Sequence, residues 1–268
     1  MSPLLAGKSV IVTGAGRGLG AAFALACAAQ GACVVVNDID AAAAHATCDA
    51  IAQSGGLAIP HVGSVANWDT ARELVEVAMS LGRLDGLVAN AAVHHQSLPW
   101  LDTEESITRI VEVNVLGVHY PGVHAMKAML DAGGSIVAIT SGARFGIPGM
   151  SAYGATKGAV SALTAGWAVE GRPYGIRVNA VSPLAQTRMS AEDRRSDRPA
   201  LAPPELIAPL VVALLGDECA EVTGQTFRFD GRTLSVYGEP LLTTLADNVS
   251  LEELRNPSRI AVRLRSAP

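Results

Sequence analysis

The sequence predicts an α/β fold with a single domain, in which a doubly wound parallel sheet of about seven strands carries helices on both faces. Strand-like runs alternate with helical runs along the chain, an order typical of parallel strands joined by right-handed crossovers. The strand runs are almost continuously apolar, which indicates a sheet covered on both faces. Hydrophobic residues make up 49% of the 268 residues and charged residues only 17%, so the chain can bury a large core.

The first half of the chain contains four expected strands and three expected helices. The strand runs are short and mostly rich in Val, Ile and Leu, whereas the helical runs are rich in Ala or repeat apolar residues three and four apart. In order, they are Lys8–Thr13 (strand), Gly18–Gln30 (helix), Ala32–Asn37 (strand), Ala41–Gln53 (helix), Leu57–His61 (strand), Trp68–Leu81 (helix) and Leu84–Ala89 (strand).

The second half continues the alternation with longer helical segments. By the same criteria, the expected elements are Glu104–Leu130 (one long helix), Ser135–Thr140 (strand), Ser151–Gly171 (helix), Ile176–Val181 (strand), Glu205–Leu215 (helix) and Thr226–Phe229 (strand). The domain is therefore expected to cover residues 1–231. The charged, proline-containing segment Ala185–Pro204 is predicted to be a mobile loop. Residues 232–268 are predicted to form a C-terminal extension, and a subunit interface is one possible location for it.

Composition and charge exclude several classes of function. The net charge of −5 and the pI of about 5.7 argue against binding to nucleic acid. No apolar run reaches the roughly 20 residues that span a bilayer, and the N-terminus does not have the pattern of a signal peptide. The four cysteines lack C-x-x-C spacing, so we expect a reduced, cytoplasmic chain without a disulfide framework or a metal site.

A glycine-rich turn follows the first expected strand and opens the first expected helix. The run T-G-A-G-R-G-L-G spans Thr13–Gly20, and its glycines allow a tight turn and a close approach of the backbone to a pyrophosphate. The helix N-terminus adds N–H groups and the positive end of a dipole. This is the arrangement of a Rossmann fold, and the expected cofactor contacts are Gly14, Arg17, Gly18, Leu19 and Gly20.

Asp38, at the end of the second expected strand, favours NAD as the cofactor. A carboxylate at this place can accept hydrogen bonds from the hydroxyl groups of the adenosine ribose, and it repels the 2′-phosphate of NADP. Arg17 in the turn is an opposing signal, because an arginine there can bind a 2′-phosphate. We give Asp38 the greater weight and predict NAD.

Tyr153 and Lys157 are candidate catalytic residues. Their spacing of four residues places both side chains on one face of a helix. An ammonium group beside a phenol favours the phenolate and is expected to lower its pKa from about 10, so that the phenol can exchange a proton with an alcohol oxygen. Ser141 follows an apolar strand at the carboxyl edge of the sheet, where ligands bind in open α/β folds.

Taken together, these motifs resemble those of the classical short-chain dehydrogenase/reductase family. The resemblance covers about residues 7–231 in the family's order, and it includes V-A-N-A-A at Asn90, V-N-V-L-G at Asn114 and R-V-N-A-V-S-P from Arg177 to Pro183. It implies that Tyr153 is the acid/base, that Lys157 lowers its pKa and holds the nicotinamide ribose, and that Ser141 binds the substrate oxygen.

The resemblance also implies roles for residues elsewhere in the chain. Asn114 is expected to bend its helix and to hold a water molecule of a proton relay. The expected contacts with the adenine side of the cofactor are Ser64, Val65, Asn90 and Ala91, and those with the nicotinamide are Pro183 and Thr187. The sequence departs from the usual family pattern at Ser64, Ala92 and Leu184, without loss of a catalytic group.

The expected substrate is a bulky or apolar secondary alcohol or its ketone, because the candidate pocket residues are mostly apolar. They are Val93, His94, His95, Gly142, Phe145, Met150, Leu184 and Met189, with Arg144 more typical of the surface. Two adjacent histidines without a third ligand do not make a metal site. A resemblance to hydroxysteroid and 3-hydroxyacyl-CoA dehydrogenases suggests a steroid alcohol, a terpenoid alcohol or a 3-hydroxyacyl thioester.

Two alternatives concern the type of function, and a further expectation concerns the assembly. The chain could instead be an NADPH-dependent reductase of 3-oxoacyl carrier-protein substrates or ketones, or a non-catalytic dinucleotide sensor or scaffold. Small residues on Ser151–Gly171, among them Gly158 and Gly166, allow helices of two chains to approach closely. The family pairs these helices, so a homo-oligomer, either a tetramer or a dimer, is expected.

Overall fold

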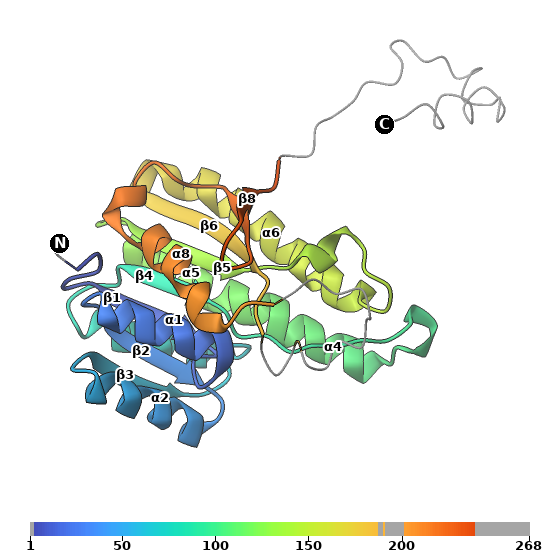
Figure 1. Cartoon of the computed structure of the whole chain (residues 1–268), viewed down its shortest axis with the longest axis horizontal. Helices are drawn as coiled ribbons and strands as arrows, with labels where there is room; N and C mark the ends of the chain where they lie inside the picture. Colours follow the sequence, from blue (N-terminus) through green and yellow to red (C-terminus); the bar gives the residue numbers. More distant parts are fainter. Residues whose placement is uncertain (1–2, 187–189, 191–200, 239–268) are drawn as a thin grey trace, which may run out of the picture. The chain divides into compact units, whose positions relative to one another are not determined.

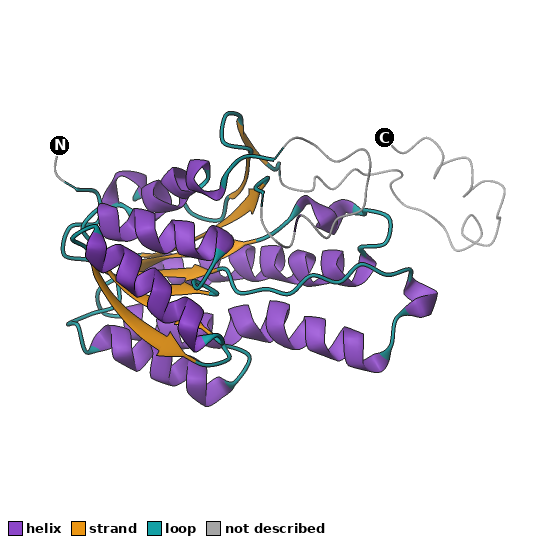
Figure 2. Ribbon diagram, turned by 60° about the horizontal axis from the view of Figure 1, so that its bottom comes forward, coloured by secondary structure: helices purple, strands orange, loops and turns teal. Residues whose placement is uncertain are grey.

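The computed structural model describes residues 3–186, 190 and 201–238. In the described part that extends to Val236, an eight-stranded sheet lies between two layers of helices (Figures 1 and 2). The predicted fold class is confirmed. One core layer contains Phe23 and Ile51, and the other contains Leu74, Met129 and Trp167, so the sheet is buried on both faces.

The strand order is β3-β2-β1-β4-β5-β6-β7-β8, and all pairs are parallel except β7–β8. The order reverses between β1 and β4, and the two loops that follow these strands meet at the carboxyl edge of the sheet, where open α/β folds bind ligands. The strands are β1 (Ser9–Thr13), β2 (Cys33–Asp38), β3 (Leu57–Val62), β4 (Gly86–Ala89), β5 (Gly134–Ile139), β6 (Ile176–Pro183), β7 (Thr226–Phe229) and β8 (Leu234–Val236). Strand β8 is an addition that the sequence did not predict, and it lies beyond the expected domain end at residue 231.

The helices form two groups, according to their contacts with one another. Helices α1 (Gly18–Ala29), α2 (Ala41–Gln53) and α8 (Ala208–Leu215) form one group, and α3 (Trp68–Met79), α4 (Glu104–Val111), α5 (Gly117–Met129) and α6 (Ser151–Gly171) form the other (Figure 1). In the described part of the chain, none of these helices is both long and apolar enough to cross a bilayer.

The prediction of one continuous helix over Glu104–Leu130 is wrong, because the helix is interrupted. A π-helical turn at Glu112–Leu116 separates α4 from α5. Such turns are rare and often occur at functional sites. Asn114 lies within the turn, and its side chain is hydrogen-bonded to the backbone of Val93, so the helix adjusts locally to contacts with a distant loop.

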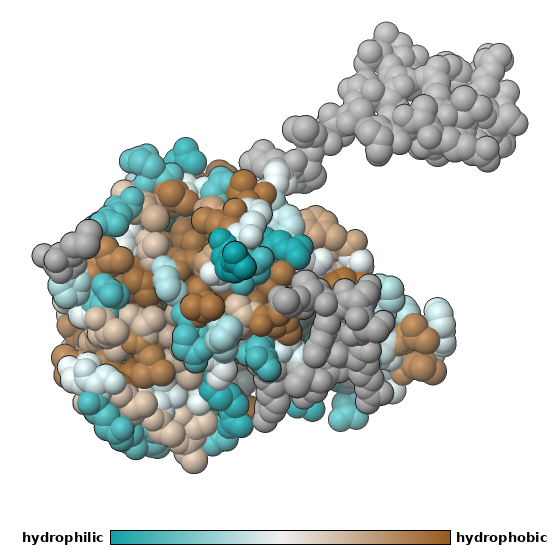
Figure 3. Space-filling model, viewed as in Figure 1, coloured by the Kyte–Doolittle hydropathy of each residue, from teal (hydrophilic) through white to brown (hydrophobic). Residues whose placement is uncertain are grey.

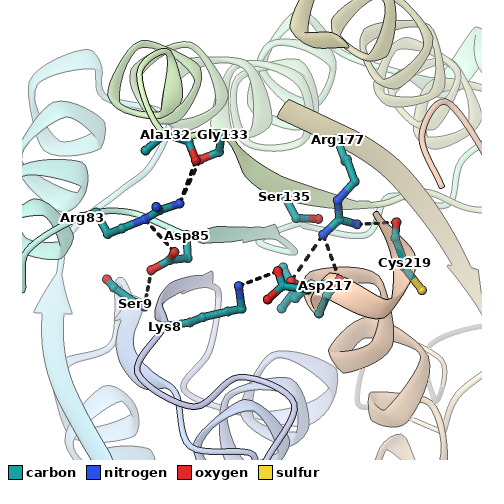
Figure 4. Close-up of polar contacts among 12 residues, drawn as sticks. Lys8, Ser9, Arg83, Asp85, Ala132, Gly133, Ser135, Arg177, Asp217 and Cys219 are labelled. Carbon is teal, nitrogen blue, oxygen red and sulfur yellow. Dashed lines mark hydrogen bonds and ion pairs between the residues drawn. The ribbon is translucent and has the colours of Figure 1, made fainter. Parts of the chain in front are cut away.

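Charged side chains line a cavity of about 610 Å³ at the amino edge of the sheet, opposite the loops that carry the candidate site. Arg177 on β6 donates to the carbonyl oxygens of Leu214 (2.7 Å) and Gly216 (3.0 Å) at the end of α8, and Arg83 forms an ion pair with Asp85 (Figure 4). Helix C-termini carry partial negative charge, so these cations stabilise the helix ends. The arrangement explains Arg177 as a structural residue.

Candidate active site

The three predicted catalytic side chains meet just beyond the carboxyl end of β5. Ser141 directly follows Thr140 at the end of the strand, and its side chain is hydrogen-bonded to that of Tyr153 on α6. One turn later, the Nζ atom of Lys157 donates to the carbonyl oxygen of Ile139 at 2.8 Å and lies 5.7 Å from the centroid of the Tyr153 ring. Both side chains are buried, with 9% of Tyr153 and 2% of Lys157 exposed.

Buried hydroxyl groups hold α6 against the end of β5. Thr140 Oγ1 donates to the carbonyl oxygen of Lys157 at 2.8 Å, and Ser161 Oγ donates to the same oxygen at 3.0 Å. These bonds connect the strand that carries Ser141 to the helix that carries the tyrosine and the lysine. The relative positions of the three side chains are therefore set by a buried network rather than by a loop.

The pKa values of this cluster differ from the sequence-based expectation. Burial raises the pKa of Tyr153 to about 12, and the hydrogen bond with Ser141 only partly opposes this increase. Burial also lowers the pKa of Lys157 to about 8. The expected lowering of the phenol pKa by the ammonium is therefore not found in the protein alone, because the loss of solvent dominates for both groups.

Replacement of Lys157 with Met is expected to stabilise the fold. The buried ammonium donates to one carbonyl oxygen among the described residues, and its depressed pKa corresponds to a cost of about 3 kcal/mol at neutral pH. We expect the free energy of unfolding to rise by about 2 kcal/mol at pH 7. Denaturant titration would measure this change, and a loss of stability would contradict it.

The pH dependence of stability provides a second measure of the same residue. Between the folded pKa of about 8 and the unfolded value of 10.5, the unfolded chain binds more protons at Lys157 than the folded chain. The contribution of Lys157 to the free energy of unfolding therefore rises with pH across this window. The Met variant should lack this rise when the two titrations are compared.

Asn114 connects the loop after β4 to the catalytic helix. Its Oδ1 atom accepts from the backbone N–H of Val93 at 2.8 Å, and its Nδ2 atom donates to the Val93 carbonyl at 3.0 Å and to Thr156 Oγ1 at 3.2 Å. Thr156 Oγ1 in turn donates to the carbonyl oxygen of Tyr153 at 2.7 Å. The side chain thus positions two segments around Tyr153, while its role in holding a water molecule stays a prediction.

The glycine-rich turn has the geometry of a phosphate cradle. Gly14 and Gly18 have φ values of 61° and 57°, in the left-handed region that favours glycine. A Cβ atom on Gly20 would lie 2.1 Å from the carbonyl oxygen of Gly14. No side chain caps the first turn of α1 at Arg17, and the turn contains no acidic residue, so its N–H groups remain accessible to an anion.

Asn90 supports this turn from the end of β4. Its Nδ2 atom donates to the carbonyl oxygens of Thr13 at 2.9 Å and Gly14 at 3.1 Å. Thr13 Oγ1 accepts from the backbone N–H groups of Asn90 at 3.0 Å and Ala91 at 3.1 Å. The Asn90 amide therefore bonds to the turn, and a contact with adenosine is still only predicted for Asn90 and Ala91.

Asp38 lies at the end of β2 and faces the same turn. Its Oδ2 atom accepts from the N–H of Gly16 at 2.9 Å, and its Oδ1 atom accepts from the N–H of Asp40 at 3.0 Å. The guanidinium group of Arg17 forms an ion pair with Asp40. Asp38, which favours NAD, and Arg17, which favours NADP, therefore lie at the same turn. Arg17 is bound by Asp40, an acidic residue that the sequence analysis did not consider.

The remaining predicted cofactor residues follow the carboxyl ends of β3 and β6. Val65 is buried, and Ser64 Oγ accepts from the N–H of Ala66 at 3.3 Å, so Ser64 shapes its own turn. Pro183 ends β6 opposite Phe229 of β7. Thr187 and the candidate pocket residue Met189 lie outside the described residues, as does most of the segment predicted to be a mobile loop.

Two loops border Tyr153, at the side where the sequence analysis expects the substrate pocket. The ring of His94 packs edge-on against the ring of Tyr153, with a centroid distance of 5.5 Å, whereas His95 Nε2 is bonded to Asp102 Oδ1 at 2.7 Å. The N–H of Ser97 donates to the carbonyl oxygen of Gly149 at 2.8 Å and thereby joins the two loops. These two loops, residues 90–103 and 140–150, thus include one histidine at the tyrosine and one with a structural partner.

The outer part of the first loop is apolar and exposed. Trp100 and Leu101, in the short helical turn Pro99–Leu101, are 78% and 66% exposed, and Figure 3 shows this projecting loop in brown. On the second loop, Met150 is buried, whereas the guanidinium group of Arg144 stacks on the exposed ring of Phe145 at 4.5 Å. The described residues contain no group of three potential metal ligands.

A profile described as short chain dehydrogenase matches residues 8–198, which is more than half of the chain and includes the turn, Asn114, Ser141, Tyr153 and Lys157. The chain belongs to the short-chain dehydrogenase family. It is therefore an oxidoreductase of a family that acts on alcohols and ketones, as the sequence-based resemblance predicted. The hydroxysteroid and 3-hydroxyacyl-CoA subtype is not shown.

Curated short-chain dehydrogenases match most of the chain. An uncharacterized oxidoreductase of Methylorubrum extorquens is 38% identical over 85% of this chain and 98% of its own length. Cyclohexanol dehydrogenase of Acinetobacter sp. is 33% identical, with 86% and 96% covered. The 3-oxoacyl-[acyl-carrier-protein] reductase FabG of Thermotoga maritima is also 33% identical, with 85% and 98% covered.

Solved structures of short-chain dehydrogenases have the same fold. A structure from Mycobacterium avium superimposes with a TM-score of 0.89 at 33% identity and covers 99% of this chain and 97% of its own. A structure from Burkholderia cenocepacia in complex with NADP has a TM-score of 0.79 at 31% identity, with 85% and 98% covered.

The residues of this short-chain dehydrogenase fit a dinucleotide cofactor. The uncapped start of α1 and the glycines of the turn suit a pyrophosphate. The buried ammonium of Lys157 donates to one carbonyl oxygen within the described residues, which leaves donors for further acceptors. Sequence reasoning missed the residues that support this site, namely Thr13, Asp40, Asp102 and Thr156. Of these four residues, only Thr13 could have been identified from the sequence, because it lies at the end of the first predicted strand.

Proposed function

We propose that the chain is an NAD-dependent oxidoreductase that interconverts a bulky or apolar secondary alcohol and its ketone. The observation that carries the proposal is the cluster that Ser141 forms with the buried side chains of Tyr153 and Lys157 at the carboxyl edge of the sheet. The cluster is at the same edge as the glycine-rich turn, which follows β1. A group that exchanges protons thus shares this edge with a turn suited to a dinucleotide.

The bound cofactor would supply hydride transfer, and the protein would position the substrate and move the proton. Tyr153 would accept the hydroxyl proton of the alcohol during oxidation and return it to the ketone oxygen during reduction. Ser141 would hydrogen-bond the same oxygen and orient it. Lys157 would hold the nicotinamide ribose and favour the phenolate form of Tyr153.

Asp38 supports NAD over NADP, since its carboxylate faces the turn in which the adenosine ribose would bind. Gly14, Arg17, Gly18, Leu19 and Gly20 would contact the pyrophosphate side, and Pro183 the nicotinamide. The structure of a relative with NADP and the FabG relative favour the second candidate, an NADPH-dependent reductase. A non-catalytic sensor is less well supported, because the catalytic set is intact.

Oxidation and reduction assays would test the proposal. The purified chain would be supplied with NAD⁺ or NADP⁺ and a panel of cyclic alcohols, hydroxysteroids, terpenols and 3-hydroxyacyl thioesters, and with NADH or NADPH and the matching ketones. We expect NADH formation from apolar secondary alcohols. Activity confined to NADPH and ketones would favour the second candidate, and no turnover with any pair would favour the sensor.

We also propose that the chain assembles into a homo-oligomer through α6. Ala162, Ala165 and Gly166 are exposed on this helix, and Val169 is 74% exposed. A stripe of small side chains allows a second helix to approach closely. We propose further that residues 1–231 carry the functional domain, to which the start of the extension 232–268 adds β8, and that this extension has a place in such an assembly.

Replacement of Gly166 with Trp is expected to disrupt this assembly. A Cβ atom at Gly166 would meet nothing within 4 Å in a single chain, so the fold itself should tolerate a larger side chain there. We expect sedimentation velocity to show the oligomer for the natural chain and a smaller species for the variant. An unchanged sedimentation coefficient would exclude α6 as the interface.

A further inference from the structure

Arg17 and Asp40 form an ion pair beside the glycine-rich turn. Arg17 lies within the turn, and Asp40 is the N-cap residue of α2. The two carboxylate oxygens of Asp40 have different partners: Oδ1 accepts from the N–H of Ala43 at 3.1 Å, and Oδ2 accepts from the guanidinium group of Arg17. The side chain therefore caps a helix and neutralises the cation at the same time.

The turn and the start of α2 are in close contact at this point. A Cβ atom on Gly16 would lie 2.7 Å from the Cβ atom of Ala43 and 2.8 Å from Asp38 Oδ2. Since Arg17 directly follows Gly16, its side chain emerges next to the end of β2 and the start of α2. Asp40 thus binds the guanidinium group of Arg17, while the carboxylate of Asp38 accepts from the backbone of the same turn, at the place where a ribose would bind.

We propose that Asp40 is a specificity-determining residue that excludes a 2′-phosphate by occupying the guanidinium group of Arg17. This inference rests on the proposed function, because it requires a dinucleotide at the turn. Asp38 alone would account for repulsion of the phosphate, but it would leave Arg17 able to attract it. With Asp40 in place, the phosphate must displace one carboxylate while a second repels it.

The exposure of the pair suits this role. The side chains of Arg17 and Asp40 are 49% and 44% exposed, and such surface pairs contribute little to stability. Removal of the carboxylate should therefore change the charge balance of the site without unfolding the chain. The released guanidinium group would be available to bind a phosphate bidentately.

A substitution of Asp40 with Ser separates the two functions of this residue. Ser retains an oxygen that can cap α2, and it removes the charge. We expect isothermal titration calorimetry at low salt to show about tenfold tighter binding of NADP⁺ and less than a twofold change for NAD⁺, because Asp38 is still present. Added salt should reduce the gain, since the interaction is electrostatic.

Three further measurements make the test decisive. Asp40→Asn is a second capping variant without charge and should reproduce the effect. Arg17→Ala serves as the reference background, and Asp40→Ser added to Arg17→Ala should give no gain in NADP⁺ affinity over Arg17→Ala alone. Unchanged NADP⁺ binding in both Asp40 variants, with normal NAD⁺ binding, would overturn the inference and leave the proposed function intact. A natural chain that binds neither dinucleotide would overturn both.

Discussion

Replacement of Tyr153 with Phe is expected to lower kcat about 1,000-fold in both directions of the reaction, because the proton donor and acceptor is removed. The phenyl ring preserves the apolar body that is buried between α6 and the loop of His94. The affinity for NAD should therefore change only a few-fold. Steady-state kinetics and calorimetric titration of the cofactor would measure the two effects separately.

Tyr174 provides a matched control for this substitution. Its side chain lines the cavity at the amino edge of the sheet and is 52% exposed, so Tyr174→Phe removes a hydroxyl group far from the proposed chemistry. We expect normal kinetics for this variant. Equal activity of Tyr153→Phe and the natural chain would refute the assignment of Tyr153 as acid/base.

The pH profile should change with the same substitution. Alcohol oxidation requires the phenolate, and burial raises the pKa of Tyr153 in the protein alone to about 12. The rate of oxidation should therefore increase with pH through the neutral and alkaline range, whereas the rate of reduction, which uses the protonated phenol, should stay nearly constant until the pH approaches this pKa. The residual oxidation activity of Tyr153→Phe should lack the increase.

Replacement of Gly20 with Ala is expected to weaken dinucleotide binding at least 100-fold. The added Cβ atom would lie 2.1 Å from the carbonyl oxygen of Gly14 and 2.7 Å from Asn90 Nδ2, so the turn must shift. Displacement of the turn moves the N–H groups at the start of α1. The free energy of unfolding should also fall, by about 2 kcal/mol.

Gly216→Ala is the control for Gly20→Ala. Gly216 has a φ of −74°, and an added Cβ atom would make ordinary contacts of 3.4 Å or more at the opposite edge of the sheet. Cofactor titration and thermal unfolding should both be close to those of the natural chain. Normal NAD affinity in Gly20→Ala would show that the dinucleotide does not use this turn.

Much of the fold was predictable because it depends on local periodicity. The apolar strand runs and the four-residue spacing of Tyr153 and Lys157 specify elements and faces without knowledge of distant contacts. Strand β8 was not predicted, because Leu234–Val236 is short and exposed and becomes a strand only by pairing with β7. The resemblance implied a bend at Asn114, but the π-helical turn that separates α4 from α5 was not predicted, since it depends on hydrogen bonds to Val93.

The sequence by itself determined the order of the elements, the glycine-rich turn after the first strand, and the residues of the candidate catalytic set. The tertiary structure alone decided how these groups affect one another. Burial raises the pKa of Tyr153 and lowers that of Lys157, and Asp40 pairs with Arg17 across a gap of 23 positions in the chain. Solvation and charge pairing depend on distance in space, and a linear pattern carries no measure of that distance.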